Sequence, residues 1–281
     1  MLVALAAGTV APGAAAATPT SPAAVSPEST TTGTSSSSSA SANPATSADS
    51  PAVTSIPPPG ARDPLAGLQE PGDAVVLSDE TTVTRWAHPI AVHPVRNAPK
   101  DAARVVARLR MHTEDARPEV YLVLSATLDA AGNPWLRVRV PTRPNGLTGW
   151  VPADRLDRLQ VVRTQLTIDR TARTATLRRD GRPVWASPVG VGRPATPTPR
   201  GSFYVRERLP GGGGAYGPWA FGTSSYSALS DWPGGGVVGI HGTDQPGLIP
   251  GAPSHGCVRV PNAAILRLAK LMPIGTPVVV R

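Results

Sequence analysis

Short runs of β-forming residues recur from Asp73 to Arg158 and are separated by turn residues. One of them, residues 135–140, alternates apolar and basic side chains, which predicts a strand with one buried and one basic face. Asn145-Gly146 predicts a turn that leads into a further strand. The other predicted strands of this region are residues 74–77, 90–92 and 119–124. The pattern therefore indicates a small β domain over residues 71–160.

The region after residue 160 continues the β pattern. Asp180-Gly181 predicts a hairpin between residues 163–180 and 182–191, with Leu166, Ile168 and Leu177 in its core. Further strands are predicted at residues 201–209, 237–240 and 276–281. A second domain, mainly β, is therefore expected over residues 161–281.

One helix is expected in this second domain. Pro261-Asn262 is typical of a helix start, and Pro273 ends the pattern after about ten residues. Its apolar face is formed by four side chains, Ile265, Leu268, Leu271 and Met272.

The first sixty residues have a different composition. They contain no Lys or Arg, and their only acidic residues are Glu28 and Asp49. Residues 1–17 are apolar and end in four alanines, which resembles a secretory signal although a positive N-terminal region is missing. Residues 18–70 are rich in Ser, Thr, Ala and Pro and are expected to be a disordered linker. We therefore expect an exported protein of the cell wall or extracytoplasmic space.

All 27 basic residues and 17 of the 19 acidic ones follow Gly60, so the remainder of the chain is strongly basic. A nucleic-acid partner is not expected, because aromatic residues make up 4% of the chain and no Lys/Arg run is interleaved with them. An anionic cell envelope suits the charge better. No later stretch reaches the eighteen or so apolar residues of a membrane span, so no transmembrane helix is expected.

The reactive side chains converge on residues 240–260. Cys257 is the single cysteine, two of the five histidines are His241 and His255, and glycines stand beside both. A thiolate is the nucleophilic form of cysteine and needs a nearby imidazole or positive charge at neutral pH. The amides of Gly256 and Cys257 could face a developing oxyanion. The segment therefore indicates a cysteine nucleophile.

Two other interpretations of these residues remain open. A free cysteine is commonly a small buried apolar residue. His241, His255 and Cys257 could also bind zinc, although the chain has no C-x-x-C and no second cysteine. A lone thiol cannot form an internal disulfide, and in an exported chain it suggests chemistry.

His241 followed by Ser254-His255-Gly256-Cys257-Val258-Arg259 resembles the signature of the L,D-transpeptidases with a YkuD-type catalytic domain. Residues 189–192 and 196–203 resemble the family's Gly-rich and TPTPxGxF segments. The resemblance runs from about Val162 to Arg281. It implies a β-sandwich-like catalytic domain that needs no cofactor or metal.

The resemblance also implies an activity and a role for each site residue. Cys257 would attack the third-residue carbonyl of a donor peptidoglycan stem peptide, His241 would be the base, and a neighbouring stem amine would be the acceptor. Carbapenem-type β-lactams would be inhibitors. The carbonyl of Gly242 would orient His241, and Arg259 would hold a substrate carboxylate. The other oxyanion and substrate-binding candidates are Ser254, His255, Gly256 and Tyr226.

Two rival functions remain. An L,D-carboxypeptidase or other cysteine peptidase would use the same residues with water as acceptor, and a non-catalytic wall-binding protein would have a dead site. Upstream, Trp135 and the Gly149-Trp150-Val151 segment resemble bacterial SH3-like barrels, although both tryptophans could equally be core residues. The glycine-rich segments 211–214 and 234–236 are expected to be flexible lids over the site.

Overall fold

The computed structural model describes residues 63–231 and 233–281 of the chain. The signal-like segment 1–17 and residues 18–62 of the predicted linker lie outside the described residues. Among the described residues, no helix has the length and apolar character needed to span a membrane.

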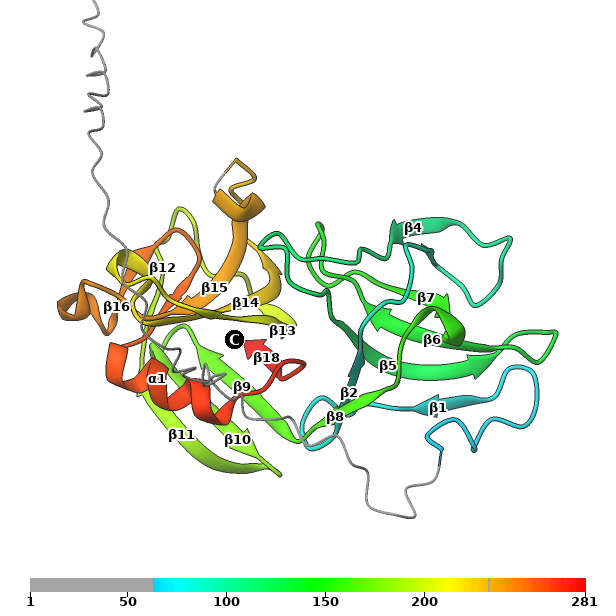
Figure 1. The fold of residues 1–281 in the computed structure, drawn as a ribbon. Helices are drawn as coiled ribbons and strands as arrows, with labels where there is room; N and C mark the ends of the chain where they lie inside the picture. Colours follow the sequence, from blue (N-terminus) through cyan, green and yellow to red (C-terminus); the bar gives the residue numbers. More distant parts are fainter. Residues whose placement is uncertain (1–62, 232) are drawn as a thin grey trace, which may run out of the picture. The chain divides into compact units, whose positions relative to one another are not determined.

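The first part of the described chain forms an eight-stranded sheet (Figure 1). Its order is β4-β3-β7-β6-β5-β2-β8, with β1 paired to β5. The 3-10 helix η1 (Ala153–Arg155) precedes the last strand. The strands are β1 (Ala74–Val76), β2 (Thr84–Ala87), β3 (Pro94–Arg96), β4 (Val105–Arg108), β5 (Tyr121–Leu128), β6 (Pro134–Arg139), β7 (Thr148–Pro152) and β8 (Gln160–Val162).

The core of this sheet follows the predicted alternation in part. In β6, Leu136 and Val138 are buried and Arg137 is exposed, as predicted, but the adjacent Trp135 on the opposite face is buried as well. The strand predicted at residues 90–92 was wrong: Pro89 forms a single bridge to Leu156, and the side chain of Ile90 is 56% exposed. Prolines at 89 and 94 flank this short apolar run and remove the N–H donors that a ladder needs.

The second part forms a ten-stranded sheet in the order β11-β10-β9-β18-β13-β14-β15-β17-β12-β16. Its strands are β9 (Thr164–Asp169), β10 (Thr174–Arg179), β11 (Arg182–Pro188), β12 (Gly190–Gly192), β13 (Gly201–Pro210), β14 (Trp219–Tyr226), β15 (Val237–His241), β16 (Gly251–Ser254), β17 (Val258–Arg259) and β18 (Pro277–Val280). The 3-10 helices are η2 (Gly214–Tyr216), η3 (Pro233–Gly236) and η4 (Pro246–Leu248).

The long strand β13 joins two halves of this sheet. Its residues 201–204 pair with β18, and its residues 205–210 pair with β14. Both halves contribute to one apolar core, for example through Leu166 and Phe221. The hairpin around Asp180-Gly181 is present between β10 and β11, but residues 163–180 form two strands instead of the single one predicted. The extra turn, residues 170–173, includes Arg173 at φ 52°.

The single α-helix, α1 (Asn262–Leu271), has the predicted bounds and packs on this core. Ile265, Leu268 and Met272 are buried as predicted, and Leu271 packs against them. The Met272 amide donates to the Leu268 carbonyl before Pro273 ends the helix. The described chain is therefore mainly β with one packed helix.

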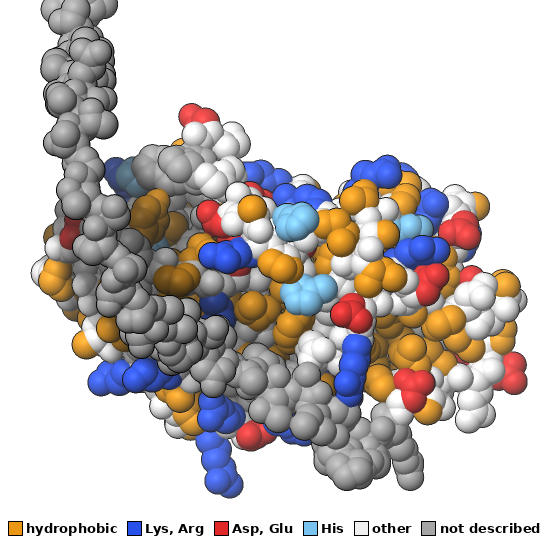
Figure 2. Space-filling model, viewed as in Figure 1, with side chains coloured by type: hydrophobic (Ala, Val, Ile, Leu, Met, Phe, Trp, Pro, Cys, Tyr) orange, Lys and Arg blue, Asp and Glu red, His pale blue; other side chains and the backbone are white. Residues whose placement is uncertain are grey.

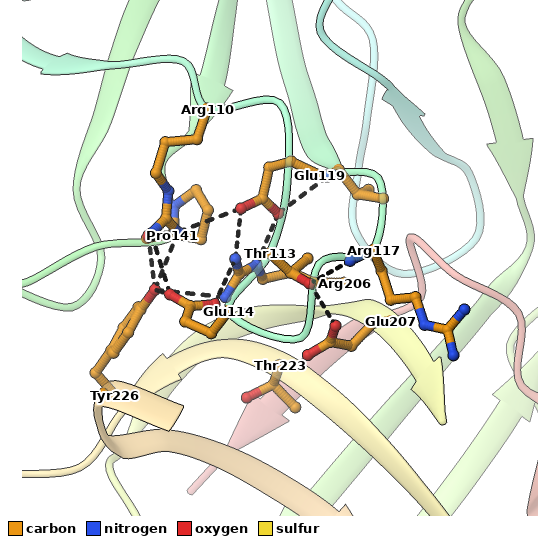
Figure 3. Close-up of polar contacts among 12 residues, drawn as sticks. Arg110, Thr113, Glu114, Arg117, Glu119, Pro141, Arg206, Glu207, Thr223 and Tyr226 are labelled. Carbon is orange, nitrogen blue, oxygen red and sulfur yellow. Dashed lines mark hydrogen bonds and ion pairs between the residues drawn. The ribbon is translucent and has the colours of Figure 1, made fainter. Parts of the chain in front are cut away.

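A cluster of buried charges joins the two sheets (Figure 3). The fully buried side chains of Glu119 and Arg206 form an ion pair, in which Arg206 Nε donates to Glu119 Oε1 at 2.8 Å. Glu114 accepts from Arg206 at 3.0 Å and from Arg110 at 3.1 Å. The Tyr226 hydroxyl donates to Glu114 at 2.7 Å. Because each carboxylate meets a guanidinium, the buried charges are compensated.

The remaining basic residues are more widely spread. On the face shown in Figure 2, Lys and Arg side chains occur singly or in small groups among apolar and uncharged ones. Such a distribution attracts polyanions over a broad surface, without one dominant basic patch on that face.

Candidate active site

The cysteine and the first histidine lie on adjacent strands. Strand β15 ends at His241, and β17 begins one residue after Cys257. The two strands are parallel, with Ile240 opposite Val258 and His241 opposite Arg259. This pairing brings residues that are sixteen positions apart in the sequence to one edge of the sheet.

The side chains of Cys257 and His241 both lie beside Gly239. A Cβ placed on Gly239 would lie 3.9 Å from Cys257 Sγ and 3.7 Å from His241 Cδ2, the carbon bonded to Nε2. The Gly239 amide also faces the sulfur, with N to Sγ at 3.4 Å. Because Gly239 has no side chain, the space next to both the thiol and the imidazole stays open.

The orientation of the His241 ring is fixed by backbone. His241 Nδ1 lies 2.6 Å from the Gly242 carbonyl oxygen. A carbonyl only accepts, so Nδ1 carries the proton and Nε2 is left to accept one. The Gly242 amide donates to the Trp219 carbonyl at 3.1 Å, which holds the peptide in place. His241 thus has the tautomer of a base without a carboxylate partner.

Burial sets the protonation of both groups. It raises the pKa of the Cys257 thiol, against the Gly239 amide and the Arg259 charge, which lower it. Burial likewise lowers the pKa of His241, with Arg259 acting in the same direction and the Gly242 hydrogen bond opposing. The resting pair is therefore a neutral thiol and a neutral imidazole. In such a pair the neutral imidazole can accept the thiol proton when the sulfur attacks.

The turn before Cys257 is held by Ser254. The Ser254 hydroxyl donates to the Cys257 carbonyl at 2.6 Å and accepts from the Gly256 amide at 3.1 Å. In this structure the Gly256 amide, a predicted oxyanion donor, donates to Ser254. The Cys257 amide donates to no group within the described residues, so it is left as the available donor.

His255 and Arg259, two other predicted site residues, each have a polar partner. His255 Nε2 contacts the Arg193 guanidinium. Arg259 lies opposite His241, and its Nη1 donates to Gln245 Oε1 at 2.9 Å, so one edge of the guanidinium is already occupied.

Tyr226 does not have the predicted position in an oxyanion lid. Its hydroxyl donates to Glu114 and to the Pro141 carbonyl, at 2.7 and 3.1 Å, within the charged cluster of Figure 3. Burial raises the pKa of this phenol. The hydroxyl therefore serves the contact between the sheets, while the backbone of Tyr226 leads to the site.

Two further side chains near the site, those of Asn262 and Ser227, were not identified as site residues from the sequence. Asn262 Oδ1 accepts from the Thr243 amide at 2.8 Å and ties the start of α1 to the turn after His241. The Ser227 hydroxyl donates to the His255 carbonyl at 2.9 Å. Neither residue belongs to a periodic pattern, and only their proximity to the His and Cys motifs in the fold reveals them.

The two glycine-rich segments occupy different places. The first leads into η2, whose Tyr216 ring packs against the His241 ring with centroids 4.9 Å apart. Tyr216 is 51% exposed, so it covers the imidazole from the solvent side. In the second segment, the Gly235 carbonyl accepts from Arg143 at 2.9 Å, and the Gly236 carbonyl accepts from the Ser227 amide at 2.8 Å.

A cavity lies outside the Cys257–His241 pair. This cavity of about 330 Å³ is lined by Arg170, Arg173 and Arg200 together with Gly192 and Ala252, and neither Cys257 nor His241 lines it. Within residues 63–231 and 233–281 no group of three or more His, Cys, Asp or Glu side chains could hold a metal ion. The zinc alternative thus has no supporting cluster in that part of the chain.

The chain is similar in sequence to known proteins. Residues 163–280 match the family model described as YkuD, the L,D-transpeptidase catalytic domain. A putative L,D-transpeptidase YkuD of Bacillus licheniformis is 35% identical over 114 residues, which cover 41% of this chain and 63% of that protein. Its Bacillus subtilis counterpart is also 35% identical, over 109 residues that cover 39% of this chain and 60% of that protein.

The chain is also similar to a solved L,D-transpeptidase structure. The NMR structure of the catalytic domain of Enterococcus faecium L,D-transpeptidase is 27% identical, covers 42% of this chain and 96% of that chain, and gives a TM-score of 0.32. The curated relatives are thus spanned to somewhat less than two thirds of their length. On the family model and these two relatives, the C-terminal segment of this chain, residues 163–280, matches the L,D-transpeptidase catalytic domain of the YkuD type.

Proposed function

We propose that this protein is a peptidoglycan L,D-transpeptidase that cross-links stem peptides through a Cys257 acyl-enzyme. The observation that carries the proposal is that Cys257 Sγ and the His241 ring both lie beside Gly239, with His241 Nδ1 fixed on the Gly242 carbonyl. The match of residues 163–280 to the catalytic domain family supports it.

In the first half-reaction His241 Nε2 takes the thiol proton as Sγ attacks the third-residue carbonyl of a donor stem tetrapeptide. The oxyanion that forms accepts from the Cys257 amide. When the intermediate collapses, the C–N bond to the terminal D-Ala breaks, and His241 returns its proton to the departing amine. A thioester on Cys257 and free D-Ala are the products.

In the second half-reaction an amine of a neighbouring stem attacks the thioester and His241 takes its proton. The thiolate leaves and is reprotonated from His241, which restores the resting pair. Transfer wins over hydrolysis only if the amine is bound and oriented, since positioning is worth effective molarities of about 10⁵ M or more. Tyr216 and the neighbouring glycine-rich segment 211–214 provide a cover that excludes water from the thioester.

The remaining parts of the proposal concern the whole chain. Residues 71–160 would be an accessory SH3-like domain and residues 161–281 the catalytic domain, with residues 18–70 as a linker to the envelope. Arg259 would hold a substrate carboxylate with its free edge, since one Nη is engaged by Gln245. We place the protein outside the cytoplasm, on peptidoglycan.

The test is labelling with a carbapenem followed by intact-mass measurement. The wild-type protein should gain the mass of one β-lactam, and Cys257→Ala should gain none while keeping its circular dichroism spectrum and unfolding midpoint. Labelling that persists in a folded Cys257→Ala protein would remove Cys257 as the nucleophile. A wild-type protein that stays unlabelled, yet binds peptidoglycan, would favour the non-catalytic wall-binding alternative.

A further inference from the structure

The end of strand β14 is held by a loop of the other sheet. The Asn145 side chain pairs with both backbone groups of Tyr226: Oδ1 accepts from the amide at 2.9 Å, and Nδ2 donates to the carbonyl at 2.8 Å. An amide side chain that makes both bonds takes the place of a neighbouring strand. The backbone of Tyr226 is therefore fixed from residues that lie more than eighty positions upstream.

Arg143 extends this hold to the residues that follow. Its guanidinium lies 4.8 Å from the centroid of the Tyr226 ring. It donates to the carbonyls of Ser227 at 3.0 Å, Leu229 at 3.1 Å and Gly235 at 2.9 Å. The planar guanidinium presents its donors in a fixed arrangement, so three carbonyls bound to one group are fixed relative to each other.

Ser227 connects this held segment to the catalytic turn. Its side chain is buried, its amide donates to Gly236, and its hydroxyl donates to the His255 carbonyl at 2.9 Å. The peptide between His255 and Gly256 is then bound at both ends, because its N–H donates to the Ser254 hydroxyl at 3.1 Å. A Cβ on Gly256 would come within 3.2 Å of Ser227 Oγ, so the contact is tight.

The orientation of this peptide bears directly on the nucleophile. Cys257 follows Gly256, and its amide donates to no group in the described part of the chain. With the preceding peptide bound by two hydroxyls, the direction of the Cys257 N–H is fixed before substrate arrives. Such preorganised donors contribute because no reorganisation is needed as the oxyanion forms.

We infer that Ser227, held in place by Arg143 and Asn145 of the N-terminal sheet, is a positioning residue that fixes the His255–Gly256 peptide and so aims the Cys257 amide at the reacting carbonyl oxygen. The inference rests on the proposed function in one respect, that Cys257 is the nucleophile. It gives the N-terminal sheet a part in catalysis that is separate from any binding to the wall.

Two reactions of the Cys257 thiol distinguish a loss of oxyanion positioning from a general disruption of the site. Acylation by a carbapenem develops an oxyanion, whereas alkylation by iodoacetamide displaces iodide and develops none at the site. Ser227→Ala should slow acylation about tenfold, less than the roughly 10²–10³-fold cost of removing an oxyanion donor itself, because the Cys257 amide is misdirected and not lost. Alkylation should change less than twofold. Ser227→Thr, which keeps the hydroxyl, should recover most of the acylation rate.

The chain offers a matched control two residues earlier, in β14. Ser225 is also buried, but its hydroxyl has no hydrogen-bond partner among the described residues. Ser225→Ala should therefore leave both rates unchanged. Asn145→Ala should slow acylation in the same direction as Ser227→Ala and by a smaller factor, because it acts one step further from the turn.

Equal loss of both rates in Ser227→Ala, or no loss of acylation, would overturn the inference. If the wild-type protein is not acylated at all, the proposed function fails, and amide hydrogen exchange then decides the inference by itself. Ser227→Ala should speed exchange at the hydrogen-bonded Gly256 amide at least tenfold, and Ser225→Ala should not. Unchanged exchange at the Gly256 amide in Ser227→Ala would contradict the proposed role.

Discussion

The buried polar groups of the Cys257–His241 pair and of the Glu119–Arg206 cluster differ in their charge. At the first, burial keeps both partners neutral and the orienting group is an uncharged carbonyl. At the second, full charges are buried and each is matched by an opposite charge. A neutral pair can take up charge when substrate reacts, whereas a compensated ion cluster resists change. The comparison indicates that the Cys257–His241 site depends on neutral buried groups, whereas the Glu119–Arg206 contact between the two sheets depends on compensated charges.

The largest expected effect comes from removing the base of the neutral pair. His241→Ala should lower the rate of Cys257 acylation by about 10²–10⁴-fold, the usual contribution of a positioned base. His255→Ala is the matched control, and it should cost less because the His255 ring nitrogen Nε2 contacts Arg193. The rates are measured by rapid-quench mass spectrometry. A reversed order of the two effects would mean that the roles of the histidines are exchanged.

Breaking the charged cluster should affect stability more than chemistry. Arg206→Met leaves the Glu119 carboxylate buried without its main partner, so unfolding free energy should fall by about 3–5 kcal/mol. Arg267→Met on the exposed face of α1 is the control and should change it little. Urea unfolding measures both variants. Because a well-packed apolar pair can replace a buried ion pair, adding Glu119→Leu to Arg206→Met should recover most of the loss.

A smaller effect concerns Glu207, which accepts from Thr113 at 2.6 Å across the two sheets. Burial, with help from Asp115, raises the pKa of Glu207 to about 7. The folded state therefore binds a proton more tightly than the unfolded state, so the stabilisation is complete below the unfolded pKa of about 4.5 and is lost as pH rises through about 7.

Glu207→Gln should remove this dependence and leave a flatter stability profile between pH 5 and 8. The exposed Glu70→Gln is the control and should keep the wild-type profile. Thermal unfolding followed across this pH range measures all three proteins. An unchanged slope in Glu207→Gln would show that other groups cause the pH dependence.

Local patterns predicted much of the second sheet and its helix. The bounds of α1 and the strand that ends at His241 follow from apolar periodicity, proline and glycine. The charged cluster was not predictable, because Glu119 and Arg206 lie 87 residues apart and each looks like a solvated charge on its own strand. Ser227 escaped for the same reason, since its hydroxyl partner is 28 residues away. The bond from the Gly256 amide to Ser254 was not predictable either, because it depends on backbone angles that sequence spacing does not reveal.

The most direct test of the central proposal, acyl transfer by a neutral cysteine–histidine pair, is product analysis. The protein is incubated with a stem tetrapeptide, alone and with saturating amine acceptor, and tripeptide and cross-linked dimer are quantified by mass spectrometry. We expect cross-linked dimer to dominate with acceptor present, and neither product with Cys257→Ala. A product that stays almost entirely hydrolysed tripeptide at saturating acceptor would contradict the transferase assignment and identify a carboxypeptidase.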